Sequence, residues 1–199
     1  PLAPELGFRT APLPEQLPDN ALLLIDRPLT GAERTRILQA VQAGASALFL
    51  AADQPLLDQL KLSTKPVEFH SLTLQGDAAR QLFDFPARRD LFWRYKSVAR
   101  AVSGPGVTPL TAPGAFSMLP LGKGKIFFAL FDRSEGDKKL AQTLKVNQNS
   151  SLYWAESINA DRLTQLTARL LAGLGAEPEF NPAVKLEHPD VEAARLDLD

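Results

Sequence analysis

Two continuous apolar runs decide the fold: Ala21-Leu22-Leu23-Leu24-Ile25, and, after a polar interval, Ala47-Leu48-Phe49-Leu50-Ala51. Runs of this length without polar alternation predict strands that are covered on both faces, as in a parallel sheet. Between them, Thr30-Gly31-Ala32-Glu33 has the pattern of a helix N-terminal capping box, and Gly44 can supply the helix end. The segment therefore predicts a strand, a helix and a second strand parallel to the first.

The downstream half predicts a hairpin and a helix. Phe116 to Leu121 and Ile126 to Phe131 flank Gly122-Lys123-Gly124-Lys125, which predicts a β-hairpin, and Pro120 places its first arm at a sheet edge. Asn159 is a suitable N-cap for an amphipathic helix that ends at Gly175. Its apolar face would carry Leu163, Leu166, Leu170 and Leu174.

The remaining segments give weaker patterns. Residues 6–11 and 152–155 are predicted to be short strands, residues 54–66 to hold one or two helical turns, and Pro66 to Phe69 to open another short extended stretch. Residues 76–115 have little periodicity, so we expect irregular structure that covers the sheet. We expect the domain to span residues 1–180 and residues 181–199 to be a linker or the lead into a following domain.

Composition excludes several function classes. The 199 residues carry 22 Lys and Arg against 23 Asp and Glu, a net charge of −1, which gives no overall attraction to nucleic acids or anionic membranes. No apolar run approaches the ~20 residues of a membrane span. The absence of cysteine excludes disulfides, thiolate metal sites and a cysteine nucleophile. The chain opens on Pro1 rather than Met, so we expect a piece of a longer protein.

Acidic residues follow several of the predicted strands: Asp26, Asp53, Asp132 and Glu156. In an open α/β sheet, ligands bind beyond the carboxyl ends of the strands, so carboxylates that converge there could hold Mg²⁺ or act as acid and base. This pattern is the basis for one hypothesis, a small metal-dependent hydrolase. Acidic residues at such positions also commonly cap helices and turns, which is the competing interpretation.

Other candidate residues give weaker signals. Phe92, Trp93 and Tyr95 could stack on sugar rings as a carbohydrate-binding site, or could form a partly buried cover. The Gly122 to Lys125 stretch lacks the spacing and the following helix of a phosphate loop, and no dinucleotide fingerprint is present. His70 and His188 have no partner at metal-ligand or catalytic spacing, so we expect neither a metal nor a cofactor.

Several stretches together resemble the class I glutamine amidotransferase-like domains, which are flavodoxin-like modules found within large bacterial glycoside hydrolases and sugar-binding proteins. They are Asn20 to Asp26, Leu29 to Glu33, Val41 to Leu50, Leu121 to Phe128 and Leu170 to Ala176. The resemblance implies a three-layer α/β fold whose sheet is mostly parallel, with an antiparallel hairpin at one edge. It also implies a leading strand and a helix before Leu6, whereas only Pro1 to Glu5 precede that residue here.

The chain departs from this family at its active site. Active members use a cysteine nucleophile, which this chain lacks, and a His and Glu pair, whereas Ser157 and Ile158 follow Glu156. The resemblance therefore implies a non-catalytic structural or interaction domain of a carbohydrate-active protein. Its partners would be neighbouring domains of the same polypeptide or a second copy, and its location periplasmic or secreted.

Overall fold

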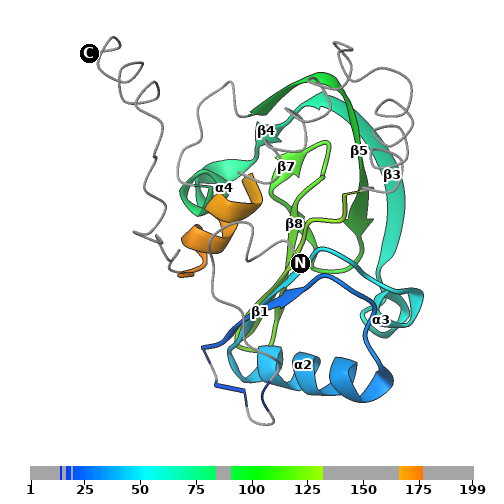
Figure 1. Cartoon of the computed structure of the whole chain (residues 1–199), viewed down its shortest axis with the longest axis vertical. Coiled ribbons are helices and arrows are strands. Elements are labelled where there is room, and N and C mark those ends of the chain that lie inside the picture. Colours follow the sequence, from blue (N-terminus) through cyan, green and yellow to red (C-terminus); the bar gives the residue numbers. More distant parts are fainter. Residues whose placement is uncertain (1–13, 15–16, 19, 84–90, 132–165, 177–199) are drawn as a thin grey trace, which may run out of the picture.

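The structure is a computed structural model of the 199-residue chain, and it describes residues 14, 17–18, 20–83, 91–131 and 166–176. The side chains of residues 93–95 are not included in that description. Within these ranges strands outnumber helices, and the arrangement is a mixed α/β fold (Figure 1).

The main sheet has five strands in the order β1-β2-β9-β8-β6. Its strands are β1 (Leu22–Ile25), β2 (Ser46–Phe49), β9 (Gly124–Phe128), β8 (Ser117–Leu121) and β6 (Thr108–Pro109). The first three are parallel to one another, whereas β8 runs antiparallel to β9, and β6 antiparallel to β8. The strands β1 and β2 are joined by α2 (Gly31–Ala43), so the predicted strand, helix and strand are confirmed.

Buried residues cover both faces of this sheet because side chains alternate along each strand. On one face, Phe49 and Phe128 pack against the apolar stripe of α2 and stack at 5.8 Å between ring centroids. The α2 stripe consists of Ile37, Leu38 and Val41. On the other face, Leu48 and Phe127 join a second cluster formed with α4 (Gly76–Leu82) and the helical residues 166–173.

A long two-stranded ribbon rises beside the main sheet and curves over it (Figure 1). It is formed by β3 (Ser63–Ser71) and the 12-residue β5 (Phe92–Ser103), and it follows the short α3 (Gln54–Gln59). The Arg100 N–H donates to the Leu130 carbonyl at 2.7 Å, which joins β5 to the end of the main sheet. A third, small sheet pairs β4 (Thr73–Leu74) with β7 (Thr111–Ala112).

The predicted flavodoxin-like, mostly parallel three-layer fold is wrong. Antiparallel pairing is not confined to one hairpin. In the main sheet β8 is antiparallel to β9 and β6 is antiparallel to β8, and the ribbon adds two long antiparallel strands. The expectation of irregular structure over residues 76–115 is also wrong, since this range contains α4, β5, β6 and β7.

Other element predictions have mixed outcomes. The hairpin around Gly122 is confirmed, but β8 is not an edge strand along its whole length, because its first residues pair with β6. The helix that ends at Gly175 is confirmed over residues 166–173, whereas its predicted N-cap Asn159 and the apolar residue Leu163 lie outside the described residues. The expected strands at residues 6–11 and 152–155 and the linker at 181–199 lie outside the described residues.

Candidate functional site

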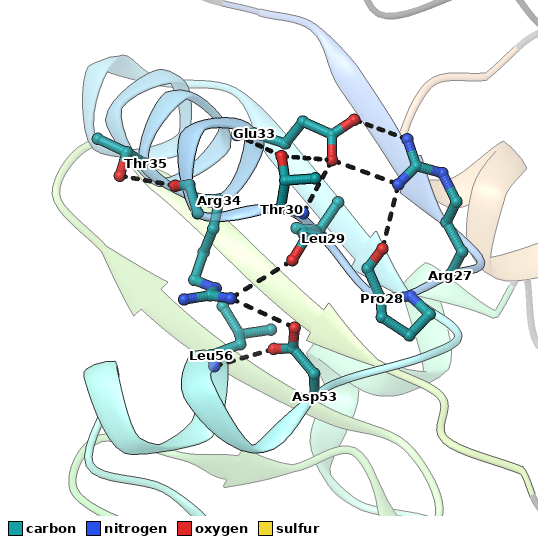
Figure 2. Close-up of polar contacts among 10 residues, drawn as sticks. Arg27, Pro28, Leu29, Thr30, Glu33, Arg34, Thr35, Asp53 and Leu56 are labelled. Carbon is teal, nitrogen blue, oxygen red and sulfur yellow. Dashed lines mark hydrogen bonds and ion pairs between the residues drawn. The ribbon is translucent and has the colours of Figure 1, made fainter.

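The candidate site is the pair of loops that follow β1 and β2, at the carboxyl ends of these parallel strands (Figure 2). The first loop leads into α2 and the second into α3. Four charged side chains interact in two pairs at this edge of the sheet: Arg27 with Glu33, and Arg34 with Asp53. Glu33 belongs to the N-terminal cap of α2 and Asp53 to that of α3, so the acids of the candidate site also serve as helix caps.

The first pair is built on the N-terminus of α2. The Glu33 backbone N–H donates to Thr30 Oγ1 at 3.3 Å, and the Thr30 backbone N–H donates to Glu33 Oε2 at 2.9 Å, which is the predicted capping box. Arg27 lies across from the same carboxylate, with Nη2 2.7 Å from Oε1 and Nη1 3.3 Å from Oε2. Glu33 therefore holds the helix start and the arginine at once (Figure 2).

Hydrogen bonding lowers the pKa of Glu33 from its ordinary 4.5 to about 2. The largest cause is the hydrogen bond from Arg27, followed by those from the backbone and the hydroxyl of Thr30, all of which favour the charged carboxylate. The same pairing raises the pKa of Arg27. Glu33 is consequently held in its charged form to a lower pH than an isolated glutamate would be.

The second pair connects α2 to α3. Asp53 is the N-cap of α3, where its Oδ1 accepts from the Leu56 backbone N–H at 3.0 Å. Its other oxygen, Oδ2, lies 3.3 Å from Nη2 of Arg34, which also donates to the Leu29 carbonyl at 3.4 Å (Figure 2). Both side chains are mostly buried, with 15% and 19% of their surface exposed. Both Asp53 oxygens thus accept hydrogen bonds within the protein.

The structure does not gather the four predicted acids into one site. Asp53 performs the capping role just described, and Asp26 is an exposed residue directly after β1. Asp132 and Glu156 lie outside the described residues. Among the described residues, no group of three or more His, Cys, Asp and Glu side chains is placed to hold a metal ion.

Gly122 and Lys123 form the turn between β8 and β9, Gly124 and Lys125 begin β9, and the stretch lies against the C-terminus of α2. The backbone N–H of Lys123 donates to the Gln42 carbonyl at 3.0 Å, so the turn satisfies a carbonyl at the helix end. A Cβ atom at Gly124 would overlap the carbonyl oxygens of Val41 and Ala45. These glycines therefore allow close packing of two backbones.

The aromatic candidates lie at the start of β5. Phe92 is 55% exposed, which singles it out among the large hydrophobic side chains of the described residues. Its strand position is opposite Ser71 of β3, beside a register shift in the ribbon. Trp93 and Tyr95 belong to the same strand, but their side chains lie outside the description. His70 is exposed on β3, and His188 is beyond the described residues.

Sequence reasoning found the capping box and the Asp53 position, but it missed the two arginines. Arg27 is six residues from Glu33 and Arg34 is 19 residues from Asp53, and neither spacing indicates an interaction. Arg34 and Asp53 meet because parallel pairing of β1 and β2 brings the loops that follow them to the same edge, whereas Arg27 and Glu33 meet within the first loop and the start of α2. The two arginine–carboxylate pairs hold the loops against the helix starts, and each arginine neutralises the charge of the carboxylate that it contacts.

No protein-family model matches the chain, and no curated protein matches its sequence. Among solved structures, the chain is similar to the β-galactosidase from Rahnella sp. R3, with 14% identity and a TM-score of 0.40 over 65% of this chain and 23% of that one. The exo-β-1,4-mannosidase Op5Man5 from Opitutaceae bacterium strain TAV5 has 12% identity and a TM-score of 0.41 over 80% and 26%. The β-galactosidase from Bacillus circulans sp. alkalophilus has 12% identity and a TM-score of 0.42 over 80% and 23%.

These structural neighbours are glycoside hydrolases, and the chain spans about a quarter of each. In the part of the chain that the structure describes, no helix is both long and apolar enough to cross a membrane.

Proposed function

We propose that the chain is a non-catalytic structural or interaction domain of a larger, carbohydrate-active protein. The observation that carries this proposal is the use of Asp53: one carboxylate oxygen caps α3 and the other pairs with Arg34. An acid that is engaged in this way stabilises the junction of two helices and is poorly suited to exchange ligands or protons. The carbohydrate-active parent is proposed from the sequence resemblance given above.

The competing function, a metal-dependent hydrolase, makes a distinct prediction for Asp26 and Asp53. If these carboxylates bind a metal, Mg²⁺ or Mn²⁺ added in excess over its Kd raises the melting temperature by mass action. The proposal predicts no such rise. A titration of the wild-type chain with each chloride salt, followed by differential scanning fluorimetry, measures it.

Asp26→Asn is the matched control, because Asp26 is exposed and its removal leaves the α3 cap and the Arg34 pair in place. A metal-dependent rise of several degrees in the wild type that is lost in Asp26→Asn would contradict the proposal and favour the hydrolase. KCl at equal ionic strength controls for screening of the surface charge pairs.

A second candidate function, carbohydrate binding, is favoured by the exposure of Phe92. Exposed aromatic rings provide the flat apolar surface on which sugar rings stack, and a ring contact of this kind contributes about 1 kcal/mol. Tryptophan fluorescence during titration with β-linked galacto- and manno-oligosaccharides tests it. Binding should weaken about fivefold in Phe92→Ala and stay unchanged in His70→Ala, an exposed control on the neighbouring strand; a flat wild-type titration excludes the candidate.

A further inference from the structure

Three prolines lie within strands of the described chain: Pro66 in β3, Pro109 in β6 and Pro120 in β8. Proline has no backbone N–H, so inside a ladder it removes one hydrogen bond. In an antiparallel pair, successive residues direct their N–H and C=O groups alternately toward the partner strand and away from it. The direction of each proline nitrogen can therefore be worked out from the hydrogen bonds of its neighbours.

Pro66 faces away from the ribbon. It pairs with Arg100 of β5, whose N–H donates to the Leu130 carbonyl on the far side of β5. Pro66 and Arg100 consequently form a non-hydrogen-bonded pair, and the Pro66 nitrogen and carbonyl point to the outer edge of β3. No described strand pairs with that edge, and Pro66 is itself exposed.

The other two prolines follow the same rule. Pro120 pairs with Lys125, whose N–H is directed to the Ala45 carbonyl, so the Pro120 nitrogen points away from β9. Next to Pro109, the Leu110 N–H donates to the Phe116 carbonyl, so the Pro109 nitrogen points away from β8. Each proline is thus placed where its missing donor leaves the native ladder intact and weakens only the outward-facing edge.

We propose that these three prolines prevent strand addition by a second copy of this chain, with Pro66 the main barrier because β3 is a nine-residue strand paired on one side only among the described elements. Suppose that a second copy added its β3 antiparallel to this edge, with the two Pro66 residues opposite each other. Each proline would then place a ring methylene group where the new ladder needs an N–H donor, so two hydrogen bonds would be lost in the symmetric pair. This inference does not depend on the proposed function.

The test replaces Pro66 with threonine, a residue that suits an edge strand and restores the outward N–H. Two new donors per symmetric pair should raise the self-association constant at least about tenfold. Sedimentation equilibrium of Pro66→Thr and the wild type over the same concentration range measures this constant. Hydrogen exchange locates the contact, since the outward N–H of Thr64 should gain protection in the associated species.

Pro105→Thr is the matched control, because Pro105 is an exposed proline in a turn rather than in a strand. It should associate no more than the wild type. Pro66→Gly restores the donor without a β-branched side chain and serves if Pro66→Thr fails to fold. The proposal is overturned if folded variants at position 66 keep the wild-type association constant. It is also overturned if the wild type already associates with protection of Thr64.

Discussion

At the scale of single residues, two arginines determine what the strand-end carboxylates can do. Arg27 and the Thr30 backbone hold the Glu33 carboxylate in its charged form, and Arg34 holds one oxygen of Asp53 while the α3 N-terminus holds the other. Each carboxylate is therefore fixed by several donors, which suits a structural role.

Glu33 gives a prediction about acid stability. Its pKa is about 2 in the folded protein and 4.5 ordinarily, so the stability that it contributes is fully present above pH 4.5 and is lost as the pH falls toward 2. In Glu33→Gln, which keeps the hydrogen-bonding shape of the cap without the charge, the loss of stability between pH 4.5 and 2 should be smaller than in the wild type. Urea unfolding at a series of pH values measures the difference; parallel curves for the two proteins would contradict it.

Ser117 gives a prediction about stability: unlike most substitutions of buried residues, its replacement by alanine should not destabilise the protein. It is 1% exposed, and its hydroxyl has no hydrogen-bond partner among the described residues. Ser117→Ala removes a buried group that loses its hydration without compensation, so the free energy of unfolding should stay equal or increase. The control is Thr111→Val, since the buried Thr111 hydroxyl accepts from the Phe116 N–H at 3.0 Å and its loss should cost about 1–2 kcal/mol. Thermal unfolding compares the two variants, and a lower melting temperature for Ser117→Ala would refute the prediction.

At the scale of elements, the contact between α2 and the β8–β9 turn fixes the hairpin against the helix. Gly122 adopts a left-handed conformation with φ 62°, and the turn donates to the Gln42 carbonyl at the end of α2. A residue with a side chain at either glycine would have to displace backbone atoms of the helix end. The hairpin sequence thus specifies its own turn and also the partner on which it packs.

Gly124→Ala tests this contact. The added methyl group would overlap the carbonyls of Val41 and Ala45, so the variant should lose about 1–3 kcal/mol or more of unfolding free energy. Gly31→Ala is the matched control, because a Cβ at Gly31 meets no atom within 4 Å and should leave stability unchanged or slightly higher. Denaturant unfolding measures both, and equal effects at the two glycines would show that the close packing is not decisive.

At the scale of the whole molecule, one sheet separates two apolar clusters and the ribbon stands partly outside both. Leu48 and Phe127 lie at the centre of the sheet and are fully buried, whereas the ribbon strand β3 is mostly exposed along its length. We therefore expect the central strands to unfold only when the whole main sheet unfolds, and the ribbon to open locally.

Native-state hydrogen exchange measures this difference. The amide of Leu48, in the central strand β2, should exchange at least about 100-fold more slowly than the amide of Lys65 in β3, although both strands are hydrogen-bonded. Similar protection at the two positions would show instead that the ribbon and the main sheet unfold as one unit.

The sequence by itself determined the local elements of this protein. Thr30 and Glu33 specified a helix start, the two apolar runs specified buried parallel strands, and the glycine pair specified a tight turn, because each depends on neighbours within a few residues. The absence of cysteine likewise excluded thiol chemistry in this chain.

Only the tertiary structure decided the direction of β8 and β6 in the main sheet, the pairing of β3 with β5, and the partners of Arg27 and Arg34. The pairing of β3 with β5 and the contact of Arg34 with Asp53 join residues 19 to 40 positions apart, and no local pattern encodes them. The strand-end acids show the same difference between local and long-range information. Their positions after strands could be read from the sequence. That Asp53 caps α3 and pairs with Arg34 depended on how the folded chain brought these groups together.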